Sequence, residues 1–150
     1  MTVTGVSLRD FRSYPAAEVR LGPGLTVVTG ANGAGKTNLL EAIYVGCTGR
    51  SCRTANDREL VRFGERVARV ELTAQGDDGE HAVSVGIDPG ERKRVRVDGV
   101  AVERLLDVEA RPLAAVFLPE RLELVKGAPA VRRAHLDQVV AALWPARAET

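Results

Sequence analysis

One stretch of the sequence carries residue types and a spacing that could bind phosphate. It reads Gly30-Ala31-Asn32-Gly33-Ala34-Gly35-Lys36-Thr37 and matches the Walker A pattern G-x-x-x-x-G-K-[ST]. Glycines let backbone N–H groups turn inward without Cβ clashes, so that several donors converge on one anion. In such a loop, Lys36 places an ammonium beside the β- and γ-phosphates and the Thr37 hydroxyl faces Mg²⁺. The pattern predicts a nucleotide-phosphate site, in which we include the adjoining Asn38.

The elements on either side of this loop are the ones that such chemistry requires. Leu25–Thr29 is a short apolar and β-branched run, which predicts a strand buried on both faces. Lys36–Cys47 repeats apolar residues at helical spacing, which predicts a helix. A helix that begins at the lysine points its free N–H groups and the positive end of its dipole at the phosphates.

The rest of the sequence predicts further strands and helices around this unit. Patterns typical of strands occur at 3–8, 17–21, 67–74, 81–87, 95–97 and 113–117. A short helix is expected near 59–63 and a longer one at 129–143, between Pro129 and Pro145. The order predicts an α/β fold of the P-loop NTPase class with an antiparallel β subdomain. Its parts are the P-loop unit at 25–47, a β meander at about 67–98, and a strand with helices at about 112–143.

Composition narrows the class of protein. The 150 residues have a net charge of +1, so any contact with DNA must come from local patches. The two cysteines, Cys47 and Cys52, lack the partners that a zinc site or a disulfide framework needs. No long apolar run or N-terminal leader pattern is present, so we expect a cytoplasmic protein with no membrane contact.

The segments around the loop resemble a known family. Leu8-Arg9-Asp10-Phe11-Arg12-Ser13-Tyr14, together with the loop and Asn38-Leu39-Leu40-Glu41-Ala42-Ile43, resembles the SMC and RecF group of ABC-type ATPase heads. Three further segments are similar to the RecF family, and they are 48–53, 117–122 and 126–137. The resemblance spans residues 3 to about 140, with departures at Cys52, Arg121 and His135.

This resemblance implies both a fold and a function. The fold is the first lobe of an ABC-type ATPase head, here its N-terminal portion. The function is that of an ATP- and Mg²⁺-dependent DNA-binding protein at the single-stranded/double-stranded junctions of gaps. It acts in DNA replication, recombinational repair and the SOS response, with RecO and RecR as partners in RecA loading. In the full-length family, ATP drives formation of a homodimer.

The resemblance also assigns residues. Arg12 stands where the related heads place a basic residue near the nucleotide phosphates. The Walker B acids, the ABC signature segment and the second lobe are expected beyond Thr150. We therefore assign no catalytic residue and expect ATP binding without appreciable turnover.

Other basic residues are candidates for contacts with DNA. Arg50 and Arg53 lie in the loop after the predicted P-loop helix, and loops commonly hold arginines that bind phosphate. The cluster at 91–96 is more typical of a solvated strand edge. Two other interpretations stay open, namely a P-loop kinase or other NTPase unrelated to DNA, and a piece of chain with no function of its own.

Overall fold

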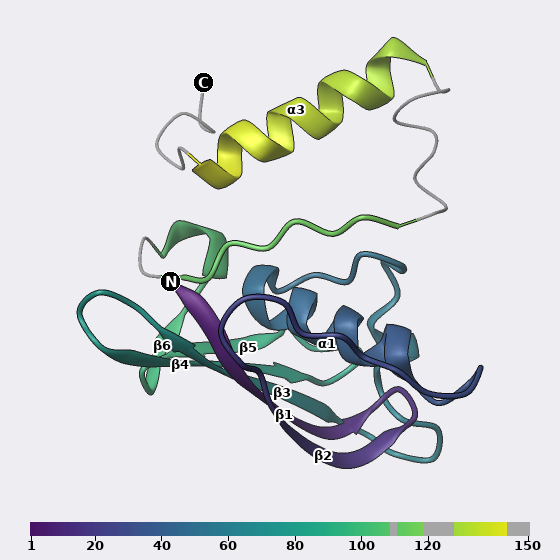
Figure 1. The fold of residues 1–150 in the computed structure, drawn as a ribbon. Coiled ribbons are helices and arrows are strands. Elements are labelled where there is room, and N and C mark those ends of the chain that lie inside the picture. The colour runs from purple at the N-terminus through teal and green to yellow at the C-terminus, as the bar shows by residue number, and fades with distance from the viewer. Residues whose placement is uncertain (109–110, 119–127, 144–150) are drawn as a thin grey trace. The chain divides into compact units, whose positions relative to one another are not determined.

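The computed structural model describes residues 1–108, 111–118 and 128–143. The chain divides into two compact units, Met1–Ala114 and Ala115–Thr150 (Figure 1). The first unit contains the P-loop and all the described strands. Parts of two segments similar to the RecF family lie outside the described residues. They are 119–122, which include Arg121, and 126–127.

The first unit is built on one antiparallel sheet. Its strands are β1 (Thr2–Phe11), β2 (Tyr14–Arg20), β3 (Ala68–Gln75), β4 (Glu80–Ile87), β5 (Arg94–Val97) and β6 (Val100–Val102). They lie in the order β2-β1-β3-β4-β5-β6. Because side chains alternate between the two faces of a strand, the period-two pattern of β3 buries Ala68, Val70, Leu72 and Ala74 on one face. The predicted meander is therefore confirmed, and β6 extends it.

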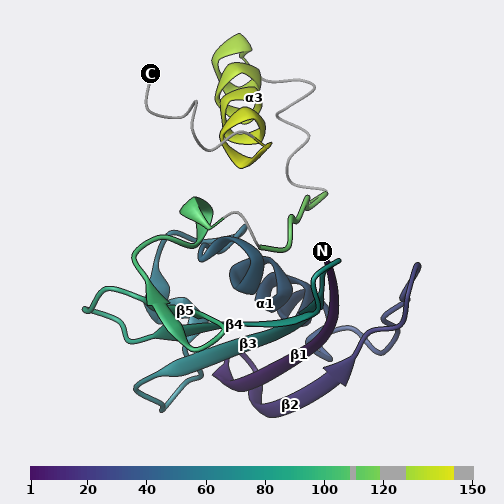
Figure 2. The same ribbon diagram turned by 90° about the vertical axis from the view of Figure 1, so that its left-hand side faces the viewer.

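Helix α1 (Lys36–Thr48) covers the apolar face of the sheet, as Figure 2 shows with the sheet seen nearly edge-on. It contacts β1, β3 and β4. Its buried residues include Leu39, Ala42 and Val45, and they join the strands in one core. Gly46 lies so close to the sheet that a Cβ atom there would overlap the side chain of Leu72. The helix ends at Gly49, whose φ of 72° suits a glycine C-cap.

The described residues also form two short 3₁₀ helices and a second α-helix. The 3₁₀ helix η1 (Asp57–Leu60) lies close to the short helix predicted near 59–63, and η2 (Leu105–Asp107) follows β6. In the second unit, α3 (Pro129–Leu143) begins at Pro129 as predicted. Among the residues that the structure describes, no helix combines the length and the apolar character needed to cross a membrane.

Two predicted strands are wrong. Residues 25–29 and 113–117 are irregular rather than strands. Leu25 and Phe117 are 90% and 94% exposed, whereas Val28 and Ala114 are half-buried against the core. An apolar run forms a strand only where neighbouring strands supply hydrogen bonds. Within the described residues, the six strands of the sheet pair with one another, and none of them pairs with 25–29 or 113–117.

Candidate functional site

The P-loop leaves the sheet after β2 and projects from the body of the first unit in both ribbon views (Figures 1 and 2). Gly33 and Gly35 adopt φ values of 82° and 93°, a region that side chains rarely reach. The Lys36 ammonium donates hydrogen bonds to the carbonyl oxygens of Gly30 and Ala31, each at 2.7 Å. The lysine is therefore folded over its own loop, beside the backbone that would surround a phosphate.

The start of α1 is open to an anion. Its N-cap is Gly35, and no side chain caps the helix. The first N–H groups of a helix have no partner within the helix and carry its positive dipole end. The turn between β1 and β2 lies against this point, because the Tyr14 hydroxyl donates to the Gly35 carbonyl at 3.2 Å and the Asn38 amide donates to the Ser13 hydroxyl at 2.9 Å.

Arg12 sits in that same turn, next to the first turns of α1. Its backbone has a φ of 52°, which costs a residue with a side chain on the order of 1–3 kcal/mol. The surroundings hold this conformation, since Phe11 is fully buried and the Arg12 N–H donates to the Leu60 carbonyl at 2.8 Å. The guanidinium does not extend freely toward the loop. It donates two hydrogen bonds to the Glu41 carboxylate, from Nε at 2.9 Å and from Nη2 at 2.8 Å.

Sequence reasoning did not single out Glu41, the buried carboxylate that holds these side chains together. Its side chain is fully buried in α1, and it accepts bonds from Arg12, from the Ser51 hydroxyl at 2.5 Å and from Arg53 Nη1 at 3.1 Å. Burial alone would raise the pKa of this carboxyl, but the hydrogen bonds from Arg12 and Ser51 and the charges of both arginines outweigh it and lower the pKa. One signal was available in the sequence, because Glu41 is the only acidic residue of α1 and has apolar neighbours on both sides.

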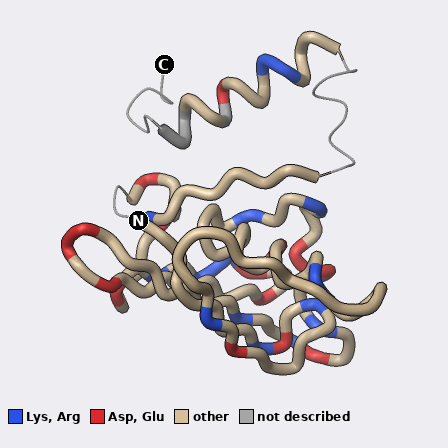
Figure 3. Tube along the Cα trace, in the orientation of Figure 1, with Lys and Arg blue, Asp and Glu red and all other residues tan. Residues whose placement is uncertain are grey.

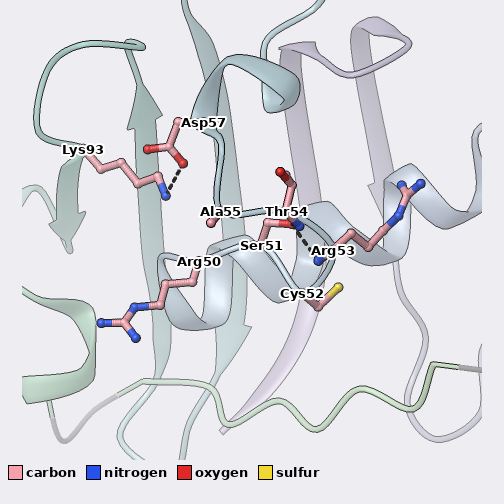
Figure 4. A pocket seen from close by; sticks show the side chains of 8 residues that line it. All are labelled: Arg50, Ser51, Cys52, Arg53, Thr54, Ala55, Asp57 and Lys93. Atoms are coloured by element: carbon pink, nitrogen blue, oxygen red, sulfur yellow. Dashed lines mark hydrogen bonds and ion pairs between the residues drawn. The ribbon is translucent and has the colours of Figure 1, made fainter. Parts of the chain in front are cut away.

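The loop after α1 brings Arg50 and Arg53 to one open hollow, shown in Figure 4. The two side chains extend in opposite directions from the loop. Arg53 reaches the first turns of α1, where Nη1 bonds both Asn38 and Glu41 at 3.1 Å. Lys93, from the connection between β4 and β5, closes another side of the hollow through an ion pair with Asp57 at 2.7 Å. The guanidinium groups of Arg50 and Arg53 therefore lie on different sides of the loop.

The segment that forms this site matches a known protein family. The family model described as "AAA domain" matches residues 6–110, which include the loop, Arg12 and Glu41. The chain belongs to the AAA domain family. Within that span lie nearly the whole sheet and all of α1, so the family match covers every element that positions the phosphate-binding loop.

Matches to individual proteins indicate a narrower group than the family model does. The chain is 42% identical over 145 residues to the "DNA replication and repair protein RecF" of Kineococcus radiotolerans, which covers 97% of this chain and 37% of that protein. It matches the solved "recombination mediator protein RecF-ATP in RecFOR pathway" with a TM-score of 0.85 and 28% identity, over 94% of this chain and 38% of the other. The chain thus spans less than half the length of these relatives, and its resemblance to RecF is confirmed.

A structure from work on "ATP-driven dimerization and DNA stimulated activation of SMC ATPases" gives a TM-score of 0.75 at 22% identity. The match covers 93% of this chain and 99% of that one. At that identity the likeness concerns the fold. The predicted fold class, an α/β P-loop ATPase head of ABC type with an antiparallel sheet, is confirmed.

A second cluster of charged side chains lies where the β3–β4 turn meets the end of β5. The His81 ring is held between two carboxylates, with Nε2 at 2.9 Å from Asp78 and Nδ1 at 2.8 Å from Asp98. These two hydrogen bonds raise the pKa of His81, that from Asp98 most, although burial opposes the rise. The same bonds lower the pKa of each aspartate. Asp98 also accepts the Ala82 N–H at 2.8 Å. This cluster joins three parts of the sheet and is remote in sequence from the P-loop.

Cys47 is not arranged as a nucleophile. Cys47 is buried in the core, and burial raises the pKa of its thiol to about 11, against the opposing charge of Arg111. A thiol with such a pKa stays protonated at neutral pH. Cys47 is therefore a small apolar core residue.

Proposed function

We propose that this chain binds ATP with Mg²⁺ at Gly30–Asn38 and forms the nucleotide-binding part of an ATP-dependent DNA-binding protein. One observation carries the proposal. The ammonium of Lys36 lies against the carbonyls of Gly30 and Ala31 at 2.7 Å, directly before a helix whose first N–H groups no side chain caps. An ammonium and several free N–H groups at one point form a donor set that suits a polyphosphate.

The residues present fit the nucleotide and its metal. The backbone N–H groups of 31–37 and the Lys36 ammonium would hold the phosphates. The Thr37 side chain is exposed at the start of α1 and would give one hydroxyl ligand to Mg²⁺. The described residues hold no group of three or more His, Cys, Asp or Glu side chains able to bind a metal alone. Mg²⁺ commonly keeps several waters and binds with substrate phosphates, so one protein ligand is sufficient.

Arg12 would add positive charge beside the phosphates. Two of its N–H groups are used by Glu41, and a guanidinium has further donors in a fixed fork. The turn is anchored by the buried Phe11, and the guanidinium is hydrogen-bonded to Glu41. These contacts would hold the charge beside the start of α1 before any nucleotide binds. The chain itself would contribute binding and orientation. We propose that it does so without appreciable turnover, and release of inorganic phosphate that depends on Lys36 would overturn this part.

The wider role is proposed from the likeness to RecF proteins. It is DNA replication and recombinational repair in the cytoplasm, at the single-stranded/double-stranded junctions of gaps, with RecO and RecR in RecA loading and the SOS response. ATP would favour a homodimer of the full-length protein. Arg50 and Arg53 are proposed DNA contacts. Arg50 is exposed at the hollow, whereas Arg53 is shared with Glu41 and Asn38.

The test is the melting temperature of the chain with and without Mg-ATP. Ligand at one hundred times its dissociation constant stabilises a fold by about 2.7 kcal/mol. We expect a clear upward shift in the native chain, no shift in Lys36→Ala, and an undiminished shift in the exposed control Arg66→Ala. A cooperative melt that Mg-ATP does not move, or a shift that survives in Lys36→Ala, would contradict the proposed site.

A further inference from the structure

Among the described residues of the first unit, no helix covers one face of the sheet. Helix α1 lies on the side where Val70, Leu72, Val83 and Val85 are buried. The outward positions of β1, β3, β4 and β5 hold small or polar side chains, apart from their arginines. The small or uncharged ones are Gly5, Ser7, Thr73, Gln75, Ala82, Ser84 and Gly86. A face without large apolar side chains is not suited to an apolar protein partner.

Strand register lines up arginines across this face. Arg9 on β1 pairs with Arg69 on β3, Arg69 pairs with Gly86 on β4, and Gly86 pairs with Arg94 on β5. Neighbouring strands lie about 4.8 Å apart, so the row from Arg9 to Arg94 is about 14 Å long. Arg96 points to the same face two residues further along β5. Gly86 leaves the middle of the row flat, because no side chain stands between Arg69 and Arg94.

This arrangement is not what stability alone would favour. Like charges directly opposite each other on neighbouring strands repel, and Arg9 faces Arg69. Glu71 offsets Arg69 at 2.6 Å and Glu91 offsets Arg94 at 2.9 Å. Arg9 and Arg96 are exposed, and their side chains have no ion-pair or hydrogen-bond partner among the described residues.

The charge balance of the face is positive. The charged side chains that point outward from β1 to β5 include more bases than acids. The bases are Arg9, Arg20, Arg69, Arg94 and Arg96, and the acids are Glu18, Glu71 and Glu80. Glu18 and Glu71 lie in the neighbouring row, which runs through Ser7 and Ser84 to Arg96, whereas Arg9, Arg69 and Arg94 share one row that contains no acid. Ser7, Arg9, Arg69 and Glu71 line a shallow hollow in the same surface. Figure 3 shows the basic positions along the strands.

We propose that this open face binds the phosphodiester backbone of DNA, with Arg9, Arg69 and Arg94 along the row and Arg96 beside them. Guanidinium groups match phosphate geometry, and a flat surface of small residues lets a backbone approach. Phosphates follow one another at about 3.4 Å along the axis of each strand, so the row meets several of them. Contacts to phosphates carry no sequence information directly, so binding of this kind is independent of sequence and sensitive to salt. This inference rests on the proposed DNA-binding function and adds a surface distinct from the loop with Arg50 and Arg53.

The experiment measures binding of a fluorescent DNA duplex of mixed sequence, about two helical turns long, by anisotropy over a series of salt concentrations. Each phosphate contact contributes about 0.9 to the slope of log affinity against log salt. We expect the double variant Arg9→Gln/Arg96→Gln, which breaks no ion pair, to lower the slope by roughly two. Affinity at about 0.1 M salt should fall roughly 10- to 100-fold.

The matched control is Arg66→Gln/Arg92→Gln, which removes the same charge from exposed positions off this row. An equal loss in the control overturns the proposal, because a general charge effect would then explain the result. A slope that falls only in Arg50→Gln/Arg53→Gln also overturns it and assigns DNA to the loop. No binding by the native chain at low salt overturns it as well. The Mg-ATP melting shift, measured on the same samples, reports separately on the nucleotide site.

Discussion

Two charged clusters in the first unit have opposite compositions. At Glu41, one carboxylate takes bonds from Arg12, Ser51 and Arg53, and its side chain is 0% exposed. At His81, one imidazole lies between Asp78 and Asp98, whose side chains are 70% and 47% exposed. Both clusters join segments that are distant in sequence. They differ in how much water reaches the charges.

That difference sets what each cluster can do. A buried carboxylate must be matched by donors, because an unpaired charge in the interior is very costly. The Glu41 cluster therefore fixes the β1–β2 turn and the loop after α1 against the P-loop helix. Exposed carboxylates are solvated in any case, and water screens their attraction to His81. The His81 cluster should respond to pH while the Glu41 cluster stays fixed.

The largest expected effect comes from Glu41→Gln, which keeps the shape and removes the charge. Arg12 and Arg53 then lose their common partner, and breaking a buried pair typically costs about 3–5 kcal/mol. For a chain of this size, we expect the melting temperature to fall by roughly 6–20 °C. Thermal unfolding checks this. Glu59→Gln is the control, since Glu59 approaches Arg12 only at 3.9 Å and is half-exposed. Similar melting of the two variants would remove the distinction between buried and exposed partners.

Ser51→Ala should have an intermediate effect. The Ser51 hydroxyl donates to Glu41 and accepts the N–H groups of Arg53 at 2.9 Å and Thr54 at 3.1 Å. Losing a bond to a charged group and leaving two N–H groups without this acceptor should cost about 2 kcal/mol in the free energy of unfolding. Urea denaturation measures it. Ser13→Ala, whose hydroxyl accepts one bond from Asn38 at the surface, should change the value by about 0.5 kcal/mol or less. An equal effect of the two variants would mean that Ser51 does not support the cluster.

The smallest effect is the pH dependence from His81. Because folding raises its pKa, His81 adds stability below its unfolded pKa of about 6.5, and this is lost as pH rises through the higher folded value. Asp78 and Asp98 have lowered pKa values, so their contribution is lost as pH falls below about 4. His81→Gln should flatten the dependence of melting temperature on pH in the range above the unfolded pKa of about 6.5. An unchanged slope in His81→Gln would show that the exposed cluster is not the pH-sensitive one.

Local patterns predicted most of the first unit. The Walker A glycines, the α1 repeat and the alternation of β1, β3 and β4 each report on residues that are neighbours in sequence, and the structure agrees with them. The strand at 25–29 failed because its pairing depends on other strands, which a local apolar run does not reveal. Glu41 shows a similar limit. Its partners Arg12 and Arg53 lie 29 and 12 residues away, so the cluster is visible only once the hairpin and the loop have folded onto α1.

The arginine row was equally hidden. The sequence shows Arg9, Arg69 and Arg94 as isolated residues, and only strand register makes them neighbours. The resemblance predicts that Arg12 lies near the phosphates, and this stays a prediction. The structure shows that its turn lies against the start of α1. The resemblance gave no indication that its guanidinium is held by a buried acid.

The close approach of Gly46 to Leu72 has an evolutionary consequence. The space between helix and sheet holds the Leu72 side chain but no Cβ at position 46. Positions 46 and 72 therefore cannot vary independently. A relative with alanine or serine at 46 should carry a smaller side chain at 72, and a relative with leucine or a larger residue at 72 should keep glycine at 46. The pair should covary although the positions lie on different elements and neither is placed in the nucleotide site. Such a signal would record how closely the P-loop helix must rest on its sheet.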